Sequence, residues 1–335
     1  MPELKFILPY VIWILAGMVL LLIVSIFIIR MKNEMSKFFW SKAKRIIEGL
    51  VLARLFDDLS DLNEKPRHLW SLKIIRRIPA ISNKLLEYIL DLKKNLSGKE
   101  RARLNTLLYD FGLTAEVIRK LKSWNWSVVA KGLNEIKEFQ DVNLYDEVMP
   151  SLHSKNRKVK MAAYRALIRL LPASNLYFLR DTDLQLSELD QIQLYNELAK
   201  RKSEIPDLES LLYSKNTSVI LFAIKMIGIF QYHAAAEKLT SLIRHSDELV
   251  AIESLRALKA LDTVAVTDLL MFRLFMIDSV PLLIAYLDTL MTLSRGRKLP
   301  LVDAYKWHPD DRVKAIFKSN IRHLTDSNNL FSKAS

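Results

Sequence analysis

The sequence predicts an all-α protein in which helical hairpins stack side by side behind an N-terminal transmembrane helix. Three observations favour this fold class. A phrase of about 17 residues recurs along the chain, at intervals near 31 residues. Only 7 glycines and 10 prolines occur in 335 residues, which is too few for the frequent turns of an all-β protein. A long uncharged apolar stretch lies near the N-terminus.

The recurring phrase is clearest from Ser154 to Leu170, where a polar turn precedes a helical pattern. Val159, Ala163 and Leu167 follow at steps of four residues, and Leu170 comes three residues later. These spacings place the four side chains on one stripe of an α-helix. Further copies carry their first valine at these positions: Val128, Val219, Val250 and Val313. Repeated helix pairs bury such stripes only by stacking, which is typical of an α-solenoid.

The spacing of the copies predicts more hairpins than are visible at first sight. The five valines are separated by 31, 60, 31 and 63 residues, so a hidden copy is predicted inside each long interval. These copies are expected near Asp190, with Leu194 and Leu198 on the stripe, and at Leu282. Two weaker copies are expected at Arg67 and at Gly98, the second with a stripe of Ala102, Thr106 and Tyr109. We therefore expect about nine hairpins over residues 57–324, most regular in 121–324.

The first element is a predicted transmembrane helix at residues 6–29, which contain no charged side chain. At 1.5 Å per residue this stretch reaches about 36 Å, and the hydrocarbon core of a bilayer is ~30 Å thick. A cleaved signal peptide is the alternative. It predicts a shorter apolar region, preceded by positive charge and followed by a small-x-small site, and the sequence has none of these features.

A basic collar follows the predicted span. Its residues are Arg30, Lys32, Lys37, Lys42, Lys44 and Arg45, against Glu34 alone. The positive-inside rule then predicts that residues 1–5 lie outside the cell and that the bulk of the chain lies in the cytosol, beneath the inner (cytoplasmic) membrane. Anionic lipid headgroups are the partner expected at the collar.

Residues 30–56 are predicted to form a basic juxtamembrane amphipathic helix, with Phe38, Phe39 and Trp40 interleaved with lysines. Such a helix either lies in the headgroup region or serves as the first solenoid helix, its apolar face covered by the second. The sequence leaves both interpretations open. At the other end, residues 325–335 are polar and are predicted to form a flexible tail.

The turn, the Asx residue and the Val, Ala and Leu positions that follow, with a period near thirty, resemble HEAT-type (armadillo-like) repeats, in the short form common among bacterial HEAT-like proteins. The resemblance covers residues 120–324 well and 46–119 loosely. It implies a superhelix that serves as a scaffold or binding platform, and it implies no reaction.

Nothing in the sequence indicates catalysis. The chain has no cysteine, which excludes disulfides, thiolate metal sites and cysteine nucleophiles, and it has no phosphate-binding or nucleophile-elbow motif. His245 and His308 occupy the same slot in two copies, so they are interpreted as turn residues. The Asp181-x-Asp183 pair is interpreted as a helix-dipole partner. We expect no enzyme, no cofactor and no metal.

One feature suggests a binding surface. Six residues after each first valine the side chain should point away from the apolar stripe, and neighbouring copies should stack about 10 Å apart. Basic residues at this slot or near it form a predicted ladder: Arg165, Lys225, Arg256, Lys137, Lys259 and Lys314. The ladder is either a solvated helix face or a partner-binding groove that suits an acidic protein segment, a phosphorylated tail or lipid headgroups.

The sequence therefore favours a single-pass membrane-anchored HEAT-repeat scaffold that binds a partner protein at the cytosolic membrane face. We expect that partner to be a membrane enzyme. The alternative is a polyanion or nucleic-acid binding module that uses the basic groove. Nucleic acid is the less expected ligand, because a membrane tether holds the groove away from genomic DNA.

Overall fold

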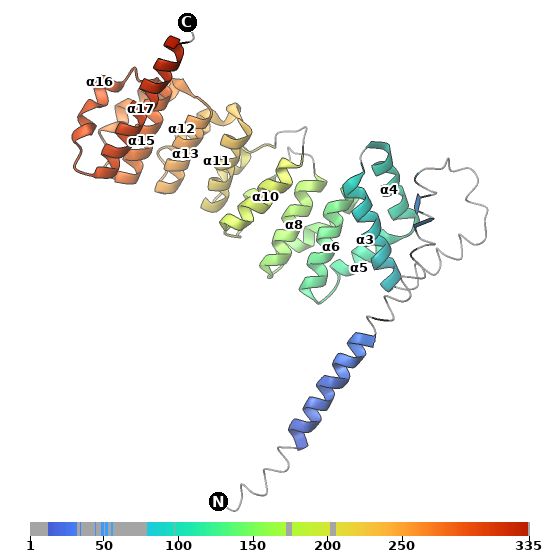
Figure 1. Ribbon diagram of the computed structural model, residues 1–335. Helices are drawn as coiled ribbons and strands as arrows, with labels where there is room; N and C mark the ends of the chain where they lie inside the picture. The colour runs from blue at the N-terminus through green and yellow to red at the C-terminus, as the bar shows by residue number, and fades with distance from the viewer. Residues whose placement is uncertain are drawn as a thin grey trace, which may run out of the picture. The chain divides into compact units, whose positions relative to one another are not determined.

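The computed structural model of the chain describes residues 13–31, 34, 44, 48–49, 51–52, 55, 79–96, 98–171, 176–201 and 206–333. Every regular element within these ranges is a helix, and no strand occurs among them. The predicted all-α class is therefore confirmed. The chain divides into two compact units, Met1–Phe139 (unit 1) and Gln140–Ser335 (unit 2) (Figure 1).

The N-terminal helix, Trp13–Met31, has 19 residues, a mean hydropathy of 2.7 and no buried part. In the described part of the chain it alone is long and apolar enough to cross a membrane, judged by length and composition. The hydroxyl of Ser25 donates to the Leu21 carbonyl at 2.8 Å, so this polar atom is satisfied inside the helix. Residues 6–12 of the predicted span lie outside the described residues.

Unit 1 contains four packed helices after its N-terminal part. They are α3 (Pro79–Asn95), α4 (Gly98–Asp110), α5 (Leu113–Leu121) and α6 (Trp126–Phe139). The stripe predicted for the copy at Gly98 is wrong, because Ala102, Thr106 and Tyr109 are exposed. Helix α4 instead buries Leu104, Leu107 and Leu108, since leucine side chains gain more from leaving water than alanine or threonine.

Part of the juxtamembrane segment packs with unit 1. Val51 and Leu55 are fully buried, and the Leu55 carbonyl accepts a hydrogen bond from Arg103 of α4 at 2.7 Å. At these two residues the structure agrees with the interpretation in which the segment joins the helical domain. The copy predicted at Arg67 and the aromatic residues at 38–40 lie outside the described residues.

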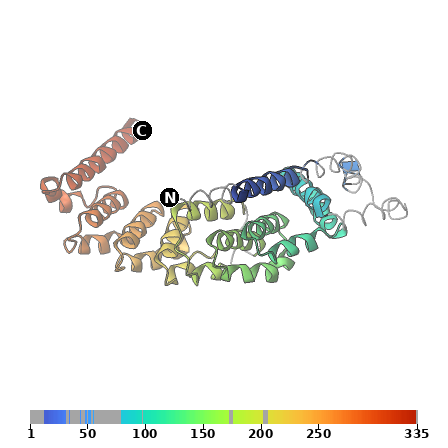
Figure 2. The same ribbon diagram turned by 90° about the horizontal axis from the view of Figure 1, so that it is seen from below.

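Six longer helices of unit 2 carry the repeated phrase. They are α8 (Arg157–Leu170), α10 (Glu188–Ala199), α11 (Thr217–Phe230), α13 (Glu248–Ala260), α15 (Val280–Ser294) and α17 (Asp311–Lys333). Helix α8 packs on α10, and α11, α13, α15 and α17 pack on one another in chain order (Figures 1 and 2). Helices α10 and α15 are the two hidden copies, which confirms the prediction drawn from the interval lengths.

Shorter elements precede these helices and complete the hairpins. They are η1 (Val142–Leu144), α7 (Tyr145–Val148), η2 (Met149–His153), α9 (Tyr177–Arg180), η3 (Ser210–Tyr213), η4 (His233–Ala235), α12 (Ala236–Leu242), η5 (Val264–Val266), α14 (Thr267–Leu274), α16 (Leu299–Val302) and η6 (Asp303–Trp307). The element that precedes α11 is the single 3-10 turn η3.

The polar turn of the phrase is a repeated helix cap. Asn156 Oδ1 accepts from the Lys158 amide at 2.9 Å, and Asp247 Oδ1 accepts from the Leu249 amide at 2.9 Å. Such caps satisfy amides that have no partner inside the helix. The residue two positions before the cap accepts a further hydrogen bond in the turn. Before α8, the backbone amide of Asn156 donates to Ser154 Oγ at 3.2 Å.

The last helix extends beyond the predicted end of the solenoid. Helix α17 continues to Lys333, whereas the sequence suggested a boundary at Leu324 and a flexible tail. Residues 325–333 contain neither glycine nor proline, so nothing in the backbone chemistry stops the helix there. The last helix therefore continues past residue 324 into the segment predicted to be a flexible tail.

Candidate functional site

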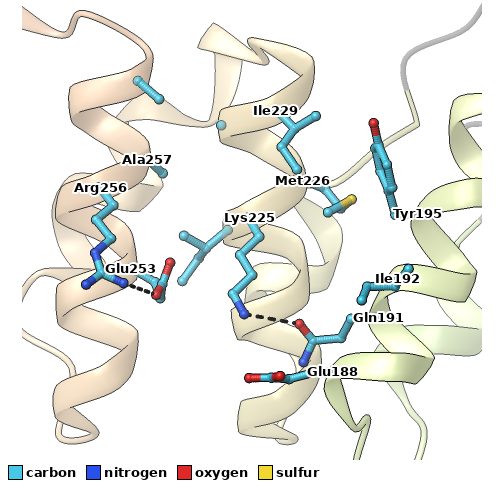
Figure 3. Close-up of a pocket in the computed structure, with 13 residues that line it drawn as sticks. Glu188, Gln191, Ile192, Tyr195, Lys225, Met226, Ile229, Glu253, Arg256 and Ala257 are labelled. Atoms are coloured by element: carbon cyan, nitrogen blue, oxygen red, sulfur yellow. Dashed lines mark hydrogen bonds and ion pairs between the residues drawn. The ribbon is translucent and has the colours of Figure 1, made fainter.

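A groove in unit 2 runs across α10, α11 and α13, with a volume of about 520 Å³ (Figure 3). Ile192 and Tyr195 of α10 lie on one side, Met226 and Ile229 of α11 on the next, and Ala257 of α13 on the third. The surface that these residues offer is mostly apolar. We call this hollow the α10–α13 groove.

Two isoleucines in the groove are not required by the packing of the repeat. Ile192 is 55% exposed and Ile229 is 54% exposed, although both stand on well-ordered helices with buried stripes on their other face. Scattered exposed apolar residues are ordinary, whereas apolar residues grouped in a concave hollow mark a binding surface. The repeat pattern did not point to either isoleucine, because it singles out only charged residues off the apolar stripe.

Charged side chains of both signs border the groove. Lys225 Nζ donates to the Gln191 side-chain oxygen at 3.4 Å, and Arg256 pairs with Glu253 at 2.7 Å, one helical turn away (Figure 3). Glu188 adds a second carboxylate at the first turn of α10. The groove border is therefore close to electrically balanced, and it suits a partner that itself carries both charges.

The structure brings together two members of the predicted basic ladder, because Lys225 and Arg256 both line the α10–α13 groove. Arg165 on α8 is half-buried and lies outside the groove lining. Lys259 pairs with Asp288 of α15 instead of facing solvent alone. Asp288 occupies the ladder slot of α15, so the next copy of the phrase neutralises this cation.

The remaining ladder residues are also bound to carboxylates. Lys314 pairs with Asp311 on its own helix at 2.5 Å, and Lys137 pairs with Glu138 at 3.4 Å. Lys137 belongs to unit 1 and the other five ladder residues to unit 2. At least four of the six cations are in ion pairs, so the ladder offers less free positive charge than the sequence suggests.

Unit 1 has a hollow of its own, of about 550 Å³, between α3 and α6. It differs from the α10–α13 groove in the residues that line it, because seven of its twelve lining residues are charged. Glu87 binds Lys131 at 2.8 Å and Lys84 at 2.9 Å, which holds the pKa of the Glu87 carboxyl below its usual value against the effect of burial. Asp91 binds Lys94 at 2.8 Å. The Glu87–Lys131 pair links α3 to α6, and the other two pairs lie within α3, so we interpret this hollow as structural.

Of the collar, the structure describes Arg30, which is exposed on the N-terminal helix, and Lys44, which lies 3.6 Å from Glu48. Lys32, Lys37, Lys42 and Arg45 lie outside the described residues.

The two histidines at equivalent positions act in turns, as predicted. His245 Nδ1 accepts from the Asp247 amide at 3.0 Å, and His308 Nδ1 accepts from the Asp310 amide at 3.1 Å. The carboxylates of Asp181 and Asp183 are bound to Arg180 and Lys160. Within the described ranges no group of three or more potential ligands could hold a metal ion.

Comparisons with known proteins assign no family. No family model matches the sequence, and no curated protein matches it. An X-ray structure of YibA from Escherichia coli is 17% identical, covers 73% of this chain and 95% of its own, and has a TM-score of 0.42. The crystal structure of an engineered protein is 12% identical, covers 64% of this chain and 96% of its own, and has a TM-score of 0.32.

Proposed function

We propose that this protein is a single-pass membrane-anchored adaptor of the HEAT-repeat type, whose α10–α13 groove holds a helical segment of a partner protein. The observation that carries the proposal is the groove itself, an apolar hollow of about 520 Å³ bordered by charges of both signs. Helix-in-groove recognition uses apolar anchors spaced along one face of the partner helix. Ile192, Tyr195 and Ile229 are placed to receive such anchors.

The anchor and its orientation form the second part of the proposal. The N-terminal helix crosses the cytoplasmic membrane once, and the basic collar keeps the helical units on the cytosolic side. Support comes from the length and hydropathy of Trp13–Met31. A partner that is itself in the membrane then meets the groove at high effective concentration, because both diffuse in the same bilayer.

Photo-crosslinking in living cells tests the groove. A photoreactive amino acid at Ile192 or Ile229 is expected to trap one and the same protein. The charge insertion Ile229→Glu, combined with the label at Ile192, should abolish that product, since a carboxylate in an apolar contact costs binding energy. The matched control is Leu249→Glu, because Leu249 is also exposed (60%) on α13 but does not line the groove.

Loss of the product in both variants, or no common product from the two labels, would refute the groove as the binding site. Orientation is tested separately with Ser335→Cys in this cysteine-free chain. The single thiol should react with a membrane-impermeant maleimide only after the membrane is permeabilised. Labelling of intact cells would refute the cytosolic placement.

The alternative function is binding of a polyanion or nucleic acid. It has less support, because Arg256, Lys259 and Lys314 already pair with carboxylates. Gel shifts with RNA and DNA separate the two functions. Binding that falls steeply between about 50 and about 200 mM salt would favour the polyanion, and the proposal expects none.

A further inference from the structure

The end of α14 in unit 2 presents an apolar face that the hairpin does not need. Phe272 is 70% exposed, Phe275 is 66% exposed and Met276 is 67% exposed. Phe272 lies on the last turn of α14, and Phe275 and Met276 follow three and four residues later in the turn that ends this helix. Phe275 stacks on Tyr305 of η6 with ring centroids 6.4 Å apart, so the face continues onto the next hairpin. We call these three residues, with Tyr305, the α14 apolar face.

The preceding hairpin shows that this face departs from the repeat. Ala235, Leu239 and Ile243 of that hairpin precede Val266, Leu270 and Leu274 by 31 residues, and all six are buried. The same shift places two polar residues, Ser241 and Arg244, opposite Phe272 and Phe275, and both are exposed. Polar residues at these two positions allow the hairpin to pack equally well. Packing therefore does not account for Phe272 and Phe275.

Arg273, which follows Phe272 in α14, brings positive charge to the face, and Arg244 lies near the same neighbouring tyrosine. Burial raises the pKa of the Tyr286 phenol, and Arg273 and Arg244 oppose that rise, so both guanidiniums lie near the same ring. Neither arginine forms an ion pair with any residue that the structure describes. Asp278, in the loop after α14, is exposed, and Asp303 is already paired with Lys306. The border of the face thus keeps a net positive charge.

Proteins bind the interfacial layer of a membrane through exposed Phe and Met side chains that lie near Arg side chains without an ion-pair partner. The apolar side chains enter the boundary of the acyl chains, and the cations contact the lipid headgroups. We propose that the α14 apolar face inserts into the surface of a bilayer that contains anionic lipid, and so gives unit 2 a membrane contact of its own. The proposal rests on the membrane anchor proposed above, because the anchor keeps a bilayer within reach of this face.

Spin labels on the full-length chain in lipid nanodiscs test this contact, since the chain has no native cysteine. The test label is Met276→Cys, and the matched control is Ser241→Cys, at an exposed position of the preceding α12 hairpin. A third label, Leu21→Cys, reports whether the N-terminal helix is in lipid. Each is measured in detergent, in phosphatidylcholine, and in phosphatidylcholine mixed with phosphatidylglycerol.

We expect the label at 276 to become protected from a water-soluble nickel chelate and open to oxygen in the mixed lipid, while the label at 241 stays open to nickel. Arg244→Gln and Arg273→Gln each remove one charge. Each should lower the ratio of inserted to uninserted label roughly fivefold. Arg295→Gln is the charge control, because it removes one cation at the opposite, C-terminal end of α15.

Equal nickel accessibility at 276 and 241 in the mixed lipid, with the label at 21 in lipid, would overturn the proposal and leave the anchor intact. Protection of 276 already in detergent would also overturn it, because a second copy or a protein partner would then cover the face. Failure of the label at 21 to report lipid would instead refute the anchor itself.

Discussion

Two helix contacts that each involve a helix with the repeated phrase differ in their chemistry. In unit 1, α6 packs against α5 around a buried ion pair, Lys120 with Glu135, and each side chain is only 7% exposed. In unit 2, α13 packs against α11 through small apolar groups, where Gly228 faces Ala257. The phrase decides which side of a helix is buried. The partner helix decides what that side is buried against.

The stability of unit 1 depends on both members of this ion pair. Lys120 Nζ donates to both carboxylate oxygens of Glu135 at 2.7 Å. Burial raises the pKa of Glu135, and the hydrogen bonds and charge of Lys120 oppose the rise. A buried pair adds little stability over an apolar pair, yet loss of one member leaves an uncompensated charge. Unit 1 should therefore tolerate substitutions in this contact far less than unit 2.

The largest expected effect is that of breaking this pair. Lys120→Met should destabilise the α5–α6 contact by about 3–5 kcal/mol, because Glu135 then stays buried without its partner. Hydrogen exchange of the full-length chain in detergent measures this, with the amides of α11 and α13 as internal reference. The double variant Lys120→Met/Glu135→Leu should recover most of the loss. Equal loss in single and double variants would show that packing, not charge, holds the contact.

The pH dependence of this variant gives an independent check. Because the folded pKa of Glu135 lies above its ordinary 4.5, the folded state binds the proton more tightly, and stability falls as pH rises through the folded pKa. Without Lys120 the deficit should be larger at about pH 7 than at about pH 4. Glu135→Gln in the same background should remove this dependence.

A smaller effect is expected from adding one methyl group to each contact. A Cβ on Gly132 would lie 3.0 Å from Lys120 Cβ and 3.1 Å from a Leu121 methyl, whereas on Gly228 it would lie 3.6 Å from Ala257 Cα and 3.7 Å from Ala260 Cβ. Gly132→Ala should therefore cost about 1–3 kcal/mol from overpacking. Gly228→Ala should be neutral or stabilise by up to ~1 kcal/mol, through helix propensity.

Hydrogen exchange of the two variants decides this comparison. Stabilisation by both alanines would mean that α5 shifts to accept the methyl group, and that the crossing at Gly132 is not tight.

The repeat could be derived from the sequence because its signal is periodic and local. The stripe of Val219, Ala223 and Ile227 is fully buried, and the hidden copies at α10 and α15 follow from interval lengths alone. Where the period was weak, the register failed. At Gly98 the stripe was assigned to Ala102, Thr106 and Tyr109, although three leucines nearby had more apolar surface to bury.

The candidate site was harder to predict, because it depends on contacts between helices far apart in the sequence. Lys225 and Arg256 were expected in one ladder, and they do line one groove. The pairing of Lys259 with Asp288, 29 residues later on α15, was not predicted, because the ladder was built from its cations alone. Ile192 and Ile229 matter only because three helices form a hollow around them, and no residue spacing expresses that arrangement.

The smallest effect is expected at the cap of α11, and it concerns how polar groups join neighbouring hairpins of unit 2. Asn216 caps its own helix through Oδ1. Its side-chain nitrogen Nδ2 donates to the backbone carbonyls of Thr182 at 3.2 Å and Leu184 at 2.9 Å. Asn216→Ser keeps a cap acceptor and loses both donations, so it should cost about 1 kcal/mol. Exchange of the α10 and α11 amides measures it.

The matched control is Asn156→Ser in the equivalent turn of α8. Asn156 caps its helix in the same way, because its Oδ1 accepts from the Lys158 amide at 2.9 Å. In the described chain, however, its side-chain nitrogen Nδ2 makes no hydrogen bond to another hairpin. Serine is as good a cap as asparagine, so this change should alter stability by a few tenths of a kcal/mol at most. An equal loss at both sites would mean that the cap alone fixes these turns. Polar contacts between the hairpins of unit 2 would then add nothing to its apolar stacking, and the contrast with the ion-paired contact of unit 1 would be sharper still.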